Sequence, residues 1–357
     1  MLRRKIIQTA ALFFICVCIK VFSCFPYLVE KYYYGICYPF ISRLFRIVFG
    51  WVPFSVGDVL YIIAAIWILY TVVKTFRNIL KKKGNRKNIL PNILWLLRRC
   101  FIVYIVFNLF WGLNYNRKGI AWQLHLTPEK YATQQLDTIV SLLLQKTNAA
   151  RSTLGKEIKY SGKDVLSAKA QEAYNTTNAR FPFISYSNRS IKASLLGTMG
   201  NYIGYAGYYN PFTGEAQLNT TIPPFELPYV ACHEMAHQIG YATEDEASFV
   251  GYLTARSSKD SAFLYSVYID LFQYANRELF YRDSALARAK FRQLDALVKQ
   301  DLQDARKFYR QYDTQFGDVI TRMYSRYLKA NSQPQGINTY SYIVSWLVAY
   351  YKKYGEI

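Results

Sequence analysis

The chain has 357 residues, of which 52% are hydrophobic and only 19% are charged, and its formal net charge is +21. This apolar and aromatic content excludes a disordered chain, and the low charged fraction argues against an ordinary soluble globular protein. Of the 44 Lys and Arg residues, 18 precede residue 121, against two of the 23 acidic residues. Because these basic residues lie between apolar runs and no nucleic-acid module is recognisable, we expect a lipid bilayer and no nucleic acid as partner.

Three apolar runs predict a membrane region over residues 1–113. The expected transmembrane helices cover about 6–25, 56–73 and 94–113. Each is long enough, or nearly so, to cross a hydrocarbon core of about 30 Å. The first run can instead be a cleaved signal peptide, but no small-x-small cleavage site follows it, which favours an uncleaved anchor.

The loop between the second and third runs sets the predicted topology. Residues 74–99 contain nine Lys and Arg residues, so the positive-inside rule places this loop in the cytoplasm. Three crossings then put residues 114–357, and the loop 26–55, on the outer side of the cytoplasmic membrane. Within that loop, residues 41–54 form either an interfacial amphipathic helix or a segment that packs on the outer domain.

Residues 114–357 are predicted to form one mainly helical domain with a small sheet. A helix is expected over 127–148, starting at TPEK, which has the form of a capping box. The Gly- and Tyr-rich stretch 196–218 predicts short strands or a hairpin around PFTGE. Helices are expected over 225–238 and from about residue 243, and helical periodicity continues towards the C-terminus.

The strongest chemical signal is HEMAH at residues 233–237, which contains two of the three His of the chain. On a helix, His233 and His237 lie on one face and can bind one metal ion, and Glu234 can act on a water molecule beside it. The structural alternative is two hydrogen-bonded histidines on a polar helix face.

A catalytic zinc ion usually has three protein ligands, so a third is needed here. His125 is possible but remote in the sequence. Gly240 can reverse the chain after the motif, and a glutamate of the next helix can then approach the metal. Glu244 and Glu246 compete for this position, because residues two apart on a helix point in different directions.

We favour Glu244 as the third ligand and keep Glu246 as the alternative. The residue three positions after Glu244 is Ala247, which is small enough to let the two helices pack closely. The residue four positions after it is Ser248, which can hydrogen-bond to a ligand. Asp245 and the remaining glutamate would stabilise the start of the helix against its dipole.

HEMAH followed by a glutamate on a second helix resembles the gluzincin branch of the zincin metallopeptidases. The spacing to Glu244 is short for that branch, and the turn at Gly240 resembles the metzincin motif HExxHxxG, although no third His follows. With its three apolar runs and the segments PFSVGD, PFTGEAQLN and HEMAHQIGYATEDEA, the whole chain looks like an uncharacterised bacterial membrane-protein family with a predicted zincin site.

The resemblance implies one Zn²⁺ ion held by His233, His237 and Glu244, with Glu234 as the catalytic base. It also implies an oxyanion donor, for which Tyr241 and Tyr340 are candidates. An edge strand commonly holds the extended substrate in such enzymes, and residues 214–219 stand at the place in the sequence where that strand is expected.

The predicted protein is therefore a zinc metallopeptidase of the bacterial cytoplasmic membrane, multi-pass, with an extracytoplasmic zincin-like domain. Its expected substrate is a peptide or protein outside the cytoplasm. The alternatives are a metal-dependent amide hydrolase of envelope material that is not a peptidase, and a non-catalytic membrane scaffold with a structural metal.

Overall fold

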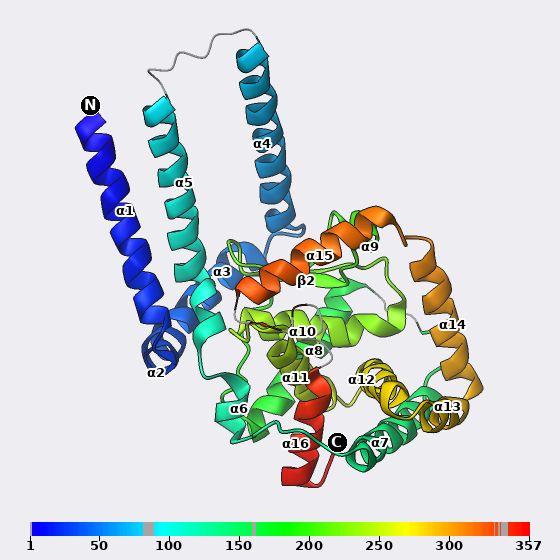
Figure 1. Ribbon diagram of the computed structural model, residues 1–357. Helices are drawn as coiled ribbons and strands as arrows, with labels where there is room; N and C mark the ends of the chain where they lie inside the picture. The colour runs from blue at the N-terminus through cyan, green and yellow to red at the C-terminus, as the bar shows by residue number, and fades with distance from the viewer. Residues whose placement is uncertain (1, 81–88, 159–161, 332, 335, 337–341) are drawn as a thin grey trace.

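The computed structural model of the chain describes residues 2–80, 89–158, 162–331, 333–334, 336 and 342–357. It is 74% helical and contains one small three-stranded sheet. The predicted mainly α fold, with three apolar helices at the N-terminus, is confirmed (Figure 1).

Three helices are long and apolar enough to cross a membrane, namely α1 (Leu2–Ser23), α4 (Val56–Leu80) and α5 (Ile89–Phe110). They match the predicted runs to within a few residues at each end. Helices α1 and α5 pack along each other, whereas α4 stands apart from this pair, and all three meet the rest of the protein at one side (Figure 1). Five of the nine basic residues in the loop 74–99 fall within 81–88 and lie outside the described residues.

The loop between α1 and α4 is helical, with α2 (Pro26–Leu28), the π-helix η1 (Val29–Cys37) and α3 (Tyr38–Gly50). One side of α3 packs on the part of the chain that follows α5 and buries Tyr38, Ser42 and Arg46. The other side leaves four large apolar side chains exposed: Phe40, Leu44, Ile47 and Val48. The packing interpretation of residues 41–54 is therefore confirmed for one side of α3, and the interfacial helix stays a prediction for the other side.

The part of the chain after α5 is built mainly from helices, and α10 and α11 lie at its centre (Figure 1). Their bounds in chain order are η3 (Gly112–Asn116), α6 (Gly119–Leu124), α7 (Thr133–Ser152), α8 (Lys163–Arg180), α9 (Gly197–Ile203), η4 (Pro224–Glu226), α10 (Leu227–Gln238), α11 (Glu244–Ala255), α12 (Ser261–Arg282), α13 (Ser284–Arg292), α14 (Ala296–Arg310), α15 (Gln315–Ala330) and α16 (Ile343–Tyr354).

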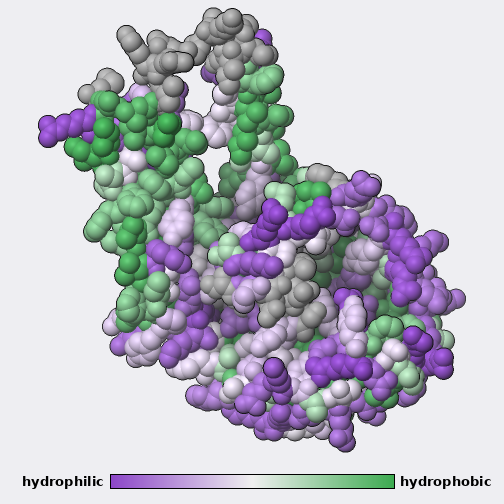
Figure 2. All heavy atoms as spheres, in the orientation of Figure 1, coloured by the Kyte–Doolittle hydropathy of each residue, from purple (hydrophilic) through white to green (hydrophobic). Residues whose placement is uncertain are grey.

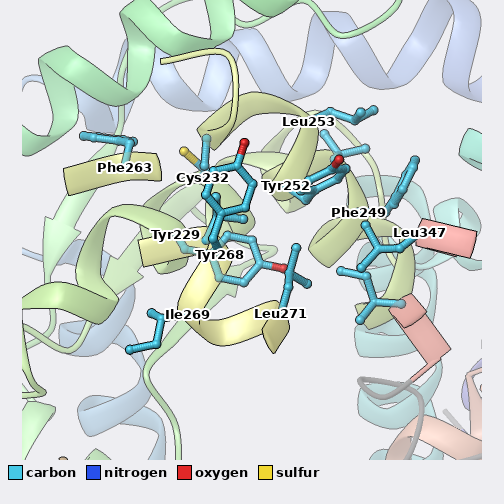
Figure 3. Packing of buried hydrophobic residues seen from close by; sticks show 14 of the residues in the cluster. Tyr229, Cys232, Phe249, Tyr252, Leu253, Phe263, Tyr268, Ile269, Leu271 and Leu347 are labelled. Atoms are coloured by element: carbon cyan, nitrogen blue, oxygen red, sulfur yellow. The ribbon is translucent and has the colours of Figure 1, made fainter. Parts of the chain in front are cut away.

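The core of this domain lies where α10, α11, α12 and α16 meet. Figure 3 shows side chains from these four helices packed together, with Tyr229 and Cys232 from α10, Phe249 from α11 and Leu347 from α16 among them. These apolar contacts hold α10 from several sides, so the helix that carries HEMAH has a fixed place in the fold.

One predicted helix boundary is wrong. The helix expected over 127–148 begins instead at Thr133, so TPEK does not start it. The first turn is satisfied locally, because the side chain of Gln135 accepts a hydrogen bond of 2.9 Å from the backbone N–H of Ala132. A capping pattern in the sequence does not show at which of two nearby positions the helix begins.

The sheet contains β1 (Ile191–Ala193), β2 (Gly207–Asn210) and β3 (Glu215–Leu218) in the order β1-β3-β2. The hairpin expected within 196–218 is present as β2 and β3, preceded by helix α9. Residues 214–219 are, however, not an edge strand. Strand β3 is central, with β1 parallel on one side and β2 antiparallel on the other, so its backbone is paired and cannot bind an extended substrate.

The start of α4 is fixed to the sheet by buried carboxylates. The backbone N–H groups of Val56 and Gly57 donate to the Glu215 carboxylate, at 3.2 and 2.6 Å. Asp58, which is fully buried, accepts a bond of 2.6 Å from the backbone of Leu195. Carboxylates at a helix N-terminus accept hydrogen bonds from its free N–H groups and interact favourably with the positive end of the helix dipole. These bonds hold the start of α4 to the sheet.

Candidate metal centre

Three side chains converge between α10 and α11. His233 and His237 come from α10, and Glu244 is the first residue of α11. Their candidate ligand atoms lie within 4.8 Å of one another, and Nε2 of His233 and of His237 lie 3.2 and 3.5 Å from the Glu244 carboxylate. Within the described ranges, these three residues are the one group of three or more His, Cys, Asp or Glu side chains close enough to hold a metal ion.

The tight connection between α10 and α11 produces this geometry. Gly240 adopts a φ of 95°, which a glycine reaches without strain, and the chain reverses there. Further along, Gly251 of α11 faces α10 so closely that an added Cβ would lie 3.1 Å from the backbone nitrogen of His233. Ala247, between these points, is fully buried. Small residues at the crossing therefore let α11 approach α10 as the sequence predicted, with Gly251 as an unpredicted contributor.

Both imidazoles are oriented through Nδ1. Nδ1 of His237 donates to the backbone carbonyl of Tyr241 at 2.7 Å, and Nδ1 of His233 lies 3.2 Å from Oγ of Ser248. Because a carbonyl only accepts, Nδ1 of His237 carries a proton, and Nε2 is the nitrogen that faces Glu244. This is the orientation that metal-binding histidines adopt in proteins.

Glu244 is held from two sides by residues that sequence analysis missed. Its Oε1 accepts a hydrogen bond of 2.7 Å from the hydroxyl of Tyr324 on α15, and its backbone N–H donates to Oε1 of Gln333 at 3.0 Å. Tyr324 is one of 33 tyrosines. No local pattern distinguishes it from the others, so nothing in the sequence pointed to this contact.

Glu234 lies beside the cluster in a buried position and is 4% exposed. Its Oε2 has no hydrogen-bond partner among the residues that the structure describes. Burial raises the pKa of Glu234 to about 8. A carboxyl group with a pKa near neutrality can both accept and release a proton, which suits a general base.

The charges of the cluster are strongly coupled. Burial alone would raise the pKa of Glu244, but hydrogen bonds from His233 and His237 outweigh it and hold that pKa well below the usual range. Burial lowers the pKa of His233, whereas the Glu244 carboxylate raises the pKa of His237 to about 9. A buried carboxylate between two imidazoles thus requires a nearby positive charge, which a divalent cation can supply in place of a proton.

The alternative third ligand lies elsewhere. Oε1 of Glu246 accepts a hydrogen bond of 2.8 Å from the backbone N–H of Ile120, at the start of α6, and is not part of the cluster. Asp245 accepts a bond of 3.3 Å from the indole of Trp346. Both acidic residues therefore have structural partners, as expected for residues of the helix start that are not ligands.

Three further candidates do not join the cluster. His125 ends α6 with a φ of 47° and lies outside the converging group. The Tyr241 hydroxyl donates to Oε1 of Gln123 at 2.8 Å, so Tyr241 acts on the site through its carbonyl group and is not placed as an oxyanion donor. Tyr340 lies outside the described residues.

The C-terminal end of α10 is capped by side chains from the segment between the first two apolar helices. Three of them donate to the carbonyl of Gln238: Tyr38 at 3.0 Å, Ser42 at 2.5 Å and Arg46 at 3.1 Å. The Tyr38 hydroxyl also lies 3.3 Å from the carbonyl of His237. These bonds satisfy carbonyl groups that have no partner within the helix, and they fix the last turn on which His237 stands.

A buried ion pair holds the following turn. Arg117 donates to both carboxylate oxygens of Glu30 at 3.1 Å, and its third contact is the carbonyl of Gly240, also at 3.1 Å. The guanidinium also lies between the rings of Tyr34 and Tyr241. Residues before position 114 therefore complete the support of the site, and experiments on it need the full chain.

The comparisons with known proteins identify a family. The family model described as "Protein of unknown function (DUF3810)" matches residues 33–348. The chain belongs to this family. No curated protein and no solved structure matches the chain. Membership of an uncharacterised family is thus confirmed, and the matched range includes α4, α5 and the whole cluster; the resemblance to gluzincins stays a prediction.

Gly207 of strand β2 leaves space for Glu234, which leads to a prediction. A Cβ added at Gly207 would lie 2.7 Å from Oε1 of Glu234 and 2.9 Å from the carbonyl of Gln217. We expect Gly207→Ala to displace the Glu234 side chain and to destabilise the protein by about 1–3 kcal/mol, as overpacking does. Thermal unfolding of the full-length protein measures the loss of stability.

The matched control is Gly155→Ala, whose added Cβ would have its nearest neighbour at 3.9 Å, an ordinary contact. This control should leave stability within about 0.5 kcal/mol of the parent. Equal behaviour of the two variants would contradict the tight fit of Glu234 against strand β2.

Proposed function

We propose that this protein is a membrane-anchored zinc metallopeptidase that hydrolyses peptide bonds on the extracytoplasmic side of the bacterial cytoplasmic membrane. The observation that carries the proposal is the convergence of Nε2 of His233, Nε2 of His237 and the Glu244 carboxylate. Beside them lies Glu234, whose Oε2 has no hydrogen-bond partner among the described residues. The excess of Lys and Arg in the loop 74–99 supports the topology, because it favours the cytoplasm for that loop.

The donor set suits zinc. Two imidazoles and one carboxylate are a common ligand set of catalytic Zn²⁺, and both imidazoles turn Nε2 towards the carboxylate. When bound, the ion would supply Lewis-acid activation of a water molecule and of the scissile carbonyl group. His233, His237 and Glu244 would hold it, while Ser248 and Tyr324 would orient two of these ligands.

Glu234 would move the proton. In hydrolysis the C–N bond breaks, the hydroxyl of water goes to the acyl carbon, and one proton must pass from water to the leaving amine. Glu234 would take up this proton and then release it to the amine, as a general base that turns into a general acid does. Its burial next to β2 would keep the carboxylate in place during both transfers.

Metal analysis of two glutamate variants tests the assignment. We expect full-length wild-type protein, purified in detergent, to contain one zinc ion per chain. Glu244→Gln should weaken zinc binding by more than about 100-fold, since even the loss of a residue that only supports a ligand costs 10–100-fold. Competition with a chelator of known affinity measures the change.

Glu246→Gln is the matched control, because Glu246 is a half-buried glutamate of the same helical turn that contacts Ile120 and not the cluster. It should bind zinc as the parent does. Equal zinc affinity of the two variants, or a parent without zinc after purification in zinc-containing buffer, would remove the basis of the metallopeptidase proposal.

A further inference from the structure

The cluster lies directly below the end of a membrane helix. Helix α5 ends at Phe110, and the next residue, Trp111, has its ring centroid 5.9 Å from that of His237, edge to face. Trp111 is 4% exposed and also packs on Tyr209 of β2 at 4.4 Å. The proposed metal site is therefore about one side chain away from the bilayer end of α5.

The distance between the proposed metal site and the end of α5 cannot vary much, because the domain is attached to the membrane helices at several points. The start of α4 is bonded to Glu215 of the central strand, and Arg46 of α3 is bonded to the end of α10. The exposed apolar side chains of α3, such as Phe40 at 70%, suit insertion at the same membrane surface. The domain is thus held against the bilayer and does not extend away from it on a linker.

Helix α15 packs beside the cluster, on the side of the protein that faces the lower end of α4 (Figure 1). Its Tyr324 reaches Glu244 on one side, and Figure 1 shows the helix crossing beneath α4 and beside the lower end of α5. Its other side exposes the apolar residues Val319 and Met323 among basic residues. Those basic residues are Arg322, Arg326 and Lys329. An apolar and basic surface in this place fits the headgroup region of an anionic bilayer.

The membrane region also offers space for an anchor. Helix α4 diverges from the α1–α5 pair, and Figure 2 shows open space between their apolar surfaces above the domain, crossed by Arg99 of α5, which lies 5.6 Å from the Trp67 ring of α4. In a bilayer this space holds lipid, and an acyl chain or a transmembrane segment of another protein can enter it from the side.

We propose that the substrate of this site is a membrane-attached polypeptide that is cut close to the point where it leaves the bilayer. This inference rests on the proposed peptidase function. The headgroup region is about 5–7 Å thick on each side, and an extended chain covers about 3.3–3.6 Å per residue. With the site one side chain below α5, the cleaved bonds should lie within about ten residues of the anchor.

The test uses full-length protein in vesicles of phosphatidylethanolamine and phosphatidylglycerol. The probe is a library of 30-residue peptides of mixed sequence, offered either free or with an N-terminal dipalmitoyl anchor. Mass spectrometry records the rate of cleavage and the position of each cut. Placing an inert polar spacer of 20 residues after the anchor keeps the library on the membrane but moves it away from the site.

We expect cuts in the anchored library to cluster within about ten residues of the anchor, and the spacer to lower the cleavage rate at least tenfold. Cleavage of free, anchored and spaced libraries at equal rates, with cut positions unrelated to the anchor, would overturn this inference and leave the peptidase proposal standing. Absence of any cleavage above that of Glu234→Gln would overturn the peptidase proposal and this inference with it.

Discussion

Glu234→Gln should lower peptide hydrolysis about a hundred- to ten-thousandfold while zinc content stays at the parental value. The amide has the shape of the carboxylate but cannot accept a proton from water. Because Oε2 of Glu234 has no hydrogen-bond partner in the described part of the chain, the exchange breaks no hydrogen bond of that atom there. Cleavage of the anchored library and metal analysis, carried out on the same preparation, measure the two quantities.

The outcome separates three hypotheses. Loss of hydrolysis with retained zinc supports the catalytic assignment of Glu234. Unchanged biological function of Glu234→Gln in cells would instead favour a scaffold in which the metal is structural. Hydrolysis of envelope amides by the parent, with no cleavage of any peptide library, would replace the peptidase proposal by the amide hydrolase.

The second large effect concerns the stability of the protein. Arg117→Ala should destabilise the full chain by about 3–5 kcal/mol, because it leaves the Glu30 carboxylate buried and unpaired. It also removes the donor to the carbonyl of Gly240, on the turn between His237 and Glu244. We therefore expect a clear fall in the thermal unfolding temperature in detergent, together with weaker zinc binding.

Two variants show whether these effects come from the ion pair. Arg292→Ala removes an exposed arginine and should change stability by less than about 0.5 kcal/mol. The double variant Arg117→Met with Glu30→Leu removes both charges and should recover most of the stability. Zinc binding of the double variant should stay weakened, since the carbonyl of Gly240 still lacks its donor. Full stability of Arg117→Ala would show that the buried pair contributes little.

The spacing of residues along the chain was sufficient to predict part of the candidate metal site. His233 and His237 share a face because they lie four residues apart on a helix, and this holds for any tertiary arrangement. The choice of Glu244 over Glu246 followed from Ala247 and Ser248, and the structure brings Glu244 to the imidazoles and Ser248 to Nδ1 of His233. The connection is only a few residues long, so local geometry limits where α11 can lie.

The order of the strands in the sheet and the hydrogen-bond partners of the tyrosine hydroxyls could not be predicted from local sequence patterns. Residues 214–219 have the composition of a strand, but composition does not show that β1 and β2 would occupy both of its sides. Tyr241 is close to the motif in sequence, yet its ring packs on Arg117 and its hydroxyl reaches Gln123, which is 118 residues away. The hydroxyl of Tyr241 therefore points away from the cluster, and Tyr324 of α15, which the sequence did not single out, contacts Glu244.

The sequence by itself determined the three apolar helices, the mainly α class and the face of α10 that carries the two histidines, because these depend on hydrophobic length and helical period. Only the tertiary structure decided what supports that face. The hydroxyl of Tyr38 reaches the carbonyl of Gln238 across 200 positions, and Tyr324 reaches Glu244 across 80. Such contacts arise when whole elements pack, so they depend on the fold and not on the spacing of residues along the chain.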